Sequence, residues 1–110
     1  MATAVAELDD AEFDETIRLA DRPVLVEFWA PWCAPCRMLS PVVRDLADEF
    51  NGLVEVRQLN VDDNPQTQTR LGVMSMPTVL IFKDGDVVER MVGYRAGIKD
   101  LLRRRLQAML

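Results

Sequence analysis

The sequence Val-Leu-Val-Glu-Phe-Trp-Ala-Pro-Trp-Cys-Ala-Pro-Cys at residues 24–36 joins an apolar run of strand length to a closely spaced cysteine pair. A run of this kind is typical of a strand that is covered on both faces of a sheet. Pro35 stands where a proline is tolerated early in a helix, so we expect a helix to begin near Cys33 or Ala34. The stretch therefore predicts a strand-to-helix junction that carries both cysteines.

Outward from this junction, helical and strand patterns alternate along the chain. We expect helices at about residues 9–19, 33–50, 64–72 and 97–109, and strands at 24–29, 53–61, 78–82 and 87–92, with a further short strand at 5–8. In the second helix Met38, Val42, Leu46 and Phe50 make one apolar stripe at helical spacing, and Pro41 should kink it. This order predicts an α/β fold with a parallel central sheet, to which the closing hairpin adds an antiparallel part.

Size and charge narrow the class of protein. The chain has 110 residues, 13 basic and 18 acidic, for a net charge of −5, and no linker divides it, so we expect residues 1–110 to form a single domain. An acidic domain repels phosphate backbones, which argues against nucleic acid and anionic membrane surfaces as partners.

The expected compartment is the cytoplasm. No apolar run approaches the roughly 20 residues of a membrane helix, and residues 1–7 lack the basic and apolar segments of a secretory signal. In a reducing compartment, a close cysteine pair is more often catalytic or metal-binding than structural.

Cys33 and Cys36 are the only cysteines, and three interpretations of the pair compete. Zinc needs about four ligands, and the chain has no histidine, which leaves open only a metal shared between two chains. A structural disulfide would close a loop too short to contribute much stability. In the third interpretation, the helix N-terminus lowers the pKa of the Cys33 thiol, and Cys36 lies one turn away within bridging range. The strand-to-helix setting favours this redox pair.

Residues 24–37 resemble the active-site segment of thioredoxins. The similarity continues, over nearly the whole chain, with Pro41, Leu59-Asn60-Val61-Asp62, Met76-Pro77-Thr78, Lys83-Asp84-Gly85 and Val92-Gly93. The resemblance implies a thioredoxin fold, with a mixed sheet of four or five strands flanked by about four helices. It also implies that Cys33 is the exposed attacking thiol and Cys36 the buried resolving thiol.

The resemblance extends to residues around the pair. It implies that Trp32, Met76, Pro77 and Gly93 bind substrate, with Pro77 in a cis peptide that faces the cysteines and its backbone pairing with a substrate strand. Ala34, Pro35 and Pro41 shape the motif. Ala34 replaces the commoner glycine, a change that bears on redox potential or partner choice.

Glu27 interrupts the apolar strand on the same face as Leu25 and Trp29. It is either an edge residue that faces solvent or a buried acid beneath Cys36. Thioredoxins usually have aspartate here, which exchanges a proton with the resolving thiol, and the resemblance gives Glu27 that role in proton transfer. Many family members have lysine at the position of Gln58, and without that charge burial should raise the pKa of Glu27.

The resemblance implies a general protein-disulfide reductase, an electron carrier of cell redox homeostasis that acts by dithiol–disulfide exchange. It implies no bound cofactor and no metal, with reducing equivalents from NADPH through thioredoxin reductase. The expected substrates are disulfide-containing proteins such as reductases and peroxidases, and we expect a monomer. Two alternatives stay open: an oxidant or isomerase of folding proteins, and a non-catalytic thioredoxin-fold binding or chaperone-like subunit.

Overall fold

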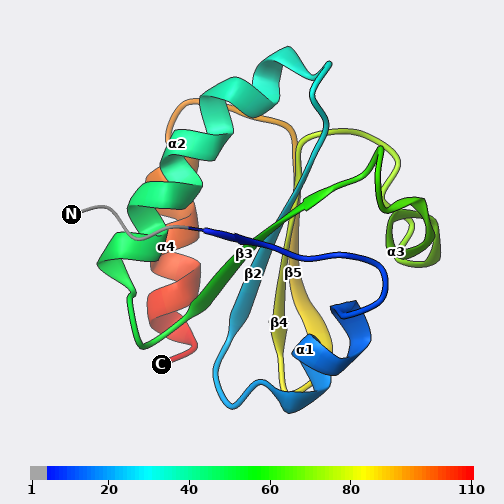
Figure 1. Ribbon diagram of the computed structural model, residues 1–110. Coiled ribbons are helices and arrows are strands. Elements are labelled where there is room, and N and C mark those ends of the chain that lie inside the picture. The colour runs from blue at the N-terminus through cyan, green and yellow to red at the C-terminus, as the bar shows by residue number, and fades with distance from the viewer. Residues whose placement is uncertain (1–4) are drawn as a thin grey trace.

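A computed structural model describes residues 5–110, in which one five-stranded sheet lies between two layers of helices (Figure 1). The strands are β1 (Ala6–Glu7), β2 (Val24–Trp29), β3 (Glu55–Asn60), β4 (Thr78–Lys83) and β5 (Asp86–Val92), and the helices are α1 (Phe13–Leu19), α2 (Ala34–Glu49), α3 (Pro65–Arg70) and α4 (Ile98–Ala108). Residues 1–4, part of the stretch that we judged to lack a secretory signal, lie outside the described residues.

The sheet is mixed, in the order β1-β3-β2-β4-β5. Strands β1, β3 and β2 run parallel, whereas β4 is antiparallel to β2 and to β5. The predicted mixed sheet of four or five strands with about four helices is therefore confirmed, and the short strand expected within residues 5–8 is present as β1.

Strand β2 lies at the centre of the sheet and is buried on both faces, as its apolar run predicts. Val26 and Phe28 belong to the core cluster on the side of α1, where Phe28 contacts Phe13. Leu25 points to the other side, into the cluster that contains Leu39 of α2. Helices α2 and α4 cover this second face, and α1 and α3 lie on the first (Figure 1).

Helix α2 turns a different stripe inward from the one predicted. Its buried residues are Cys36, Leu39, Val43, Leu46 and Ala47. The predicted stripe is wrong at Met38, which is 57% exposed, whereas Val42 is half-buried and packs against the core cluster. Each residue of an α-helix is rotated by about 100° from the one before it. Once Cys36 is buried in the first turn, the residues of α2 that face the core are therefore fixed. The helix runs from Ala34 to Glu49 with Pro41 inside it, on an exposed position.

Candidate active site

The cysteine pair lies at the beginning of α2. Cys33 and Cys36 form a disulfide with their Cα atoms 5.4 Å apart. Cys33 is the N-cap residue, with extended backbone, and its Sγ accepts a hydrogen bond of 3.2 Å from the backbone N–H of Cys36. Once the pair is reduced, the same N–H and the helix dipole would stabilise a thiolate on Cys33. Ala34 and Pro35 form the first turn between the two cysteines.

Cys33 is less accessible than the resemblance implies. In the disulfide its exposed fraction is 4%, against 3% for Cys36, so the expectation of an exposed Cys33 is wrong for this form. The reason is packing: both cysteines belong to the core cluster that includes Ala30 and Val73, and the half-buried Met76 packs against it. Access is through a hollow of about 340 Å³ lined by Trp29, Ala30, Pro31, Cys33, Cys36, Arg37, Ser40 and Arg44.

A metal site is not formed by these residues. Within residues 5–110, no group of three or more histidine, cysteine, aspartate or glutamate side chains could hold a metal ion. The disulfide also uses both sulfurs of the pair.

Glu27 is fully buried on β2, so the alternative that it faces solvent at an edge is wrong. Its strand is central, between β3 and β4. Gln58 Nε2 donates to Glu27 Oε1 at 2.7 Å, and Ser40 Oγ lies 3.2 Å from Oε1 and 3.1 Å from Oε2. These donors give the carboxylate the partners that a buried charge requires.

Burial raises the pKa of Glu27 above its ordinary value of 4.5, and this desolvation is the largest cause. Hydrogen bonds from Gln58 and Ser40 and the positive charge of Arg44 act in the opposite direction, while the negative charge of Glu7 adds to the rise. The direction agrees with the expectation drawn from the sequence. A neutral amide at position 58 donates a hydrogen bond without supplying a charge.

The raised pKa of Glu27 makes stability fall as pH rises. Between pH 4.5 and the raised pKa, the native state binds more protons than the unfolded state, so the free energy of unfolding decreases with pH by about 1.4 kcal/mol for each unit of pKa shift. We expect this decrease in the oxidised protein and a smaller decrease in Glu27→Gln, because Glu27 no longer titrates there while Glu7, whose pKa burial also raises, still does. Urea unfolding across pH 4–8, with carboxyl NMR of Glu27, measures it. An NMR midpoint at or below 4.5 would contradict the assignment.

A backbone hydrogen bond joins the loop before β4 to the end of β5. The Met76–Pro77 peptide bond is cis, as the resemblance implies. The backbone N–H of Gly93 donates to the carbonyl oxygen of Pro77 at 2.8 Å, and Gly93 has a φ of 85°, which glycine adopts readily. Met76 packs against the cluster that contains Cys33. The structure thus brings together three of the four residues expected to bind substrate.

Trp32, the fourth of these residues, is exposed. Its exposed fraction is 66%, and its indole Nε1 donates to Asp62 Oδ1 at 3.1 Å. This exposure leaves the side chain free to meet a substrate, and its contact with substrate stays a prediction. An indole held by one hydrogen bond presents a rigid apolar surface next to the disulfide.

Ser40 is the residue near the pair that sequence reasoning missed. Its hydroxyl contacts both oxygens of Glu27, although the two residues are 13 positions apart. One signal could have found it, because Ser40 follows Cys36 by four residues and therefore shares its helix face. A polar residue on that buried face calls for a buried polar partner.

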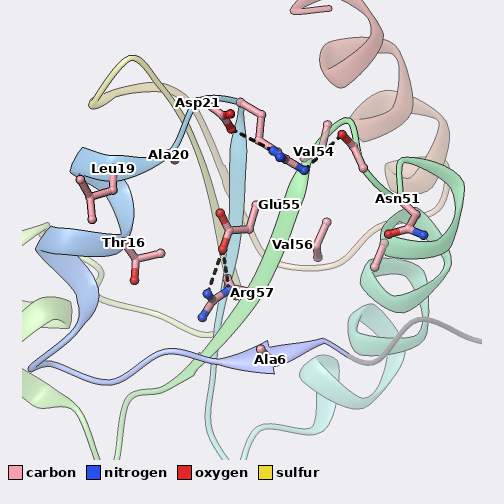
Figure 2. Close-up of a pocket in the computed structure, with 13 residues that line it drawn as sticks. Ala6, Thr16, Leu19, Ala20, Asp21, Asn51, Val54, Glu55, Val56 and Arg57 are labelled. Carbon is pink, nitrogen blue, oxygen red and sulfur yellow. Dashed lines mark hydrogen bonds and ion pairs between the residues drawn. The ribbon is translucent and has the colours of Figure 1, made fainter.

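A second hollow, of about 570 Å³, lies at the other end of the parallel strands, where α1, β3 and the end of α2 surround it (Figure 2). Its charged groups are already paired. Arg57 Nη2 lies 2.8 Å from Glu55 Oε1, and Arg22 contacts both Asp21 and the carbonyl oxygen of Gly52. The hollow is remote from the cysteines, which follow the carboxyl end of β2.

Comparisons with known proteins agree with the geometry. The model of the thioredoxin family matches residues 4–105. The chain is 45% identical over 91 residues to thioredoxin 1 of Nostoc sp., which covers 83% of the chain and 85% of that protein. It is 47% identical over 92 residues to the thioredoxin of Alicyclobacillus acidocaldarius, over 84% of the chain and 87% of that protein. It is also 44% identical over 86 residues to the chloroplastic M-type thioredoxin of Pisum sativum, over 78% of the chain and 50% of that protein.

None of the helices within residues 5–110 has the length and apolar character needed to cross a membrane.

Proposed function

The chain belongs to the thioredoxin family and is a thiol–disulfide oxidoreductase, and from this premise we propose the role of each residue at the cysteine pair. The pair acts by dithiol–disulfide exchange. Cys33 is the attacking thiol, Cys36 the resolving thiol and Glu27 the group that exchanges a proton with Cys36. The observation that carries the assignment is the hydrogen bond from the Cys36 N–H to Cys33 Sγ at the helix N-terminus.

The reaction proceeds in two exchanges. The Cys33 thiolate attacks one sulfur of a substrate disulfide, which forms a mixed disulfide and releases the other substrate sulfur as a thiolate. Cys36 then loses its proton to Glu27 and attacks Cys33 Sγ, which releases the second substrate thiolate. Two electrons pass from the dithiol to the substrate, and the protein is left with the Cys33–Cys36 disulfide.

Trp32, Met76, Pro77 and Gly93 would hold the substrate in this reaction. Support comes from the exposure of Trp32, from the hydrogen bond that joins Gly93 to Pro77, and from the packing of Met76 beside the cysteines. An extended substrate segment could pair with the backbone beside Pro77 as an added strand. Ala34, Pro35 and Pro41 shape α2 around the pair.

The family implies disulfide-containing protein substrates and a reductase partner, and its members carry no bound cofactor. For this chain we propose NADPH-dependent thioredoxin reductase as the source of electrons, and reductases and peroxidases among the substrates. We further propose that residues 1–110 act as one domain, as a monomer, in the cytoplasm. A coupled assay with NADPH, a bacterial thioredoxin reductase and insulin tests the reductase partnership.

Alkylation of the reduced protein tests the roles of the cysteines. We expect iodoacetamide at pH 7 to label Cys33 at least about tenfold faster than Cys36, because the helix N-terminus favours the Cys33 thiolate. Peptide mass spectrometry at a series of short times measures both rates. In urea, where no helix stabilises either thiolate, the two rates should become similar. If folded Cys33 reacts no faster than unfolded Cys33, it is not the attacking thiol.

A further inference from the structure

Ser40 lies close to the reacting groups but has no part in the exchange described above. It is half-buried on α2, four residues after Cys36 and so on the same helix face, and it lines the same hollow as both cysteines. Its Oγ lies 3.2 Å and 3.1 Å from the two carboxylate oxygens of Glu27. The hydroxyl therefore connects the α2 face that carries Cys36 to the buried carboxylate on β2.

The two hydrogen-bond partners of Glu27 differ in what they can do. Gln58 Nε2 can only donate, and it contacts Oε1 at 2.7 Å. The hydroxyl of Ser40 can donate or accept. Within residues 5–110, Ser40 is the sole hydrogen-bond partner of Oε2, whereas Oε1 already accepts from Gln58, so Oε2 is the oxygen that is left to take a proton.

This difference matters because Glu27 is fully buried. When Glu27 is ionised, Ser40 can donate to the carboxylate. When Glu27 carries a proton on Oε2, that O–H can donate a hydrogen bond to Ser40 Oγ. Ser40 Oγ can also accept a hydrogen bond from Gln58 Nε2, which is 3.5 Å away. In both protonation states Glu27 Oε2 then keeps a hydrogen-bond partner, so this oxygen of the buried carboxyl group is not left unpaired.

We propose that Ser40 is a positioning residue for the exchange reaction, whose hydroxyl holds the Glu27 carboxyl group by Oε2 and stays hydrogen-bonded while Glu27 gains and loses a proton. The inference rests on the proposed role of Glu27 as proton acceptor of Cys36.

The charges around Glu27 are separate from this contact. Arg44 faces it from α2 and Glu7 from β1. Strand β3 contributes the neutral Gln58, and the residue paired with Glu27 on β4 is the apolar Val79. Substitution of Ser40 leaves these groups in place, so a change in the titration of Glu27 would report the lost hydroxyl.

The experiment is stopped-flow reaction of the reduced protein with excess 5,5′-dithiobis(2-nitrobenzoate). The first release of thionitrobenzoate reports attack by Cys33, and the second, whose rate is independent of reagent concentration, reports attack by Cys36. The acid limb is the fall of the second-phase rate at low pH. We expect Ser40→Ala to move this limb upward by about one pH unit, which is a roughly tenfold slowing at pH values below it. The first phase should not change, and carboxyl NMR should show the same upward shift for Glu27.

Matched variants distinguish the loss of the Ser40 hydroxyl from a general change in the packing of α2. Ser40→Thr keeps the hydroxyl and should restore the second phase. Thr69→Ala removes a hydroxyl from the exposed face of α3 and should have no effect. Because alanine is a better helix former than serine, Ser40→Ala should keep α2 folded. If Ser40→Ala changes thermal stability but leaves both the second phase and the Glu27 titration as they are, the inference is overturned.

Glu27→Gln tests the proposed role of Glu27 separately from the inference on Ser40. If Glu27→Gln keeps the acid limb of the second phase, the proposed role of Glu27 fails, whatever Ser40 does. If Glu27→Gln abolishes the limb but Ser40→Ala leaves it unmoved, only the inference on Ser40 fails. In the Glu27→Gln background, Ser40→Ala should have no further effect on the second phase, and an added slowing would show that Ser40 does not act through Glu27.

Discussion

Cys33→Ser is expected to lower the rate of insulin-disulfide reduction by at least about a thousandfold, to that of dithiothreitol alone. A serine hydroxyl does not ionise near pH 7 and cannot form a disulfide, so the first exchange has no nucleophile. The site offers no substitute, because Cys36 lies inside α2 and lacks the N-cap position that favours the thiolate of Cys33. Insulin precipitation in the presence of dithiothreitol measures the rate.

The matched reference for Cys33→Ser is the reduced wild-type protein, since both lack the disulfide. Equal thermal unfolding of the two would show that the lost activity is chemical rather than structural. If Cys33→Ser retained the activity of the wild type, Cys33 would have no place in the mechanism. The chain would then act as a non-catalytic binding or chaperone-like subunit.

Cys36→Ser is expected to stop the reaction after the first exchange. Cys33 should still attack, but no second sulfur remains to release it, so turnover should fall at least about a hundredfold while a mixed disulfide accumulates. We expect close to one substrate-derived adduct per protein, visible by intact-mass spectrometry and removed by dithiothreitol. The adduct should map to Cys33.

The double variant Cys33→Ser/Cys36→Ser is the control for this trap, and it should form no adduct. The assignment of the two thiols would be contradicted if the two single variants exchanged their behaviour. If Cys33→Ser formed the stable adduct through Cys36 and Cys36→Ser did not form one through Cys33, Cys36 would be the attacking thiol.

Much of the fold follows from short stretches of sequence. The run from Val24 to Trp29 is apolar enough to be buried on both faces, and the structure places it at the centre of the sheet. The closing hairpin was expected from its strands at 78–82 and 87–92, and Asp84 and Gly85 between β4 and β5 both adopt positive φ. These features depend on neighbours in the chain, so local patterns are sufficient to predict them.

Local sequence patterns were not sufficient to predict which face of α2 points inward. Stripes through Met38 and through Leu39 are both apolar, and the sequence offers little to choose between them. The structure buries Leu39 and leaves Met38 exposed, because the disulfide and the packing of Cys36 fix the rotation of the helix. The low exposure of Cys33 is also a result of tertiary packing, because the Cys33 side chain belongs to the core cluster.

The strand-to-helix junction, the spacing of Cys33 and Cys36 and the presence of an acid in an apolar strand can be read from the chain alone, because these are properties of adjacent residues. How that acid is held depends on contacts between distant parts of the chain. Glu27 meets Gln58 because β2 and β3 pair in register at these two residues, and it meets Ser40 because α2 crosses that face of the sheet at the same level. Contacts between residues 13 and 31 positions apart depend on strand register and helix rotation, which the packing of the whole core sets.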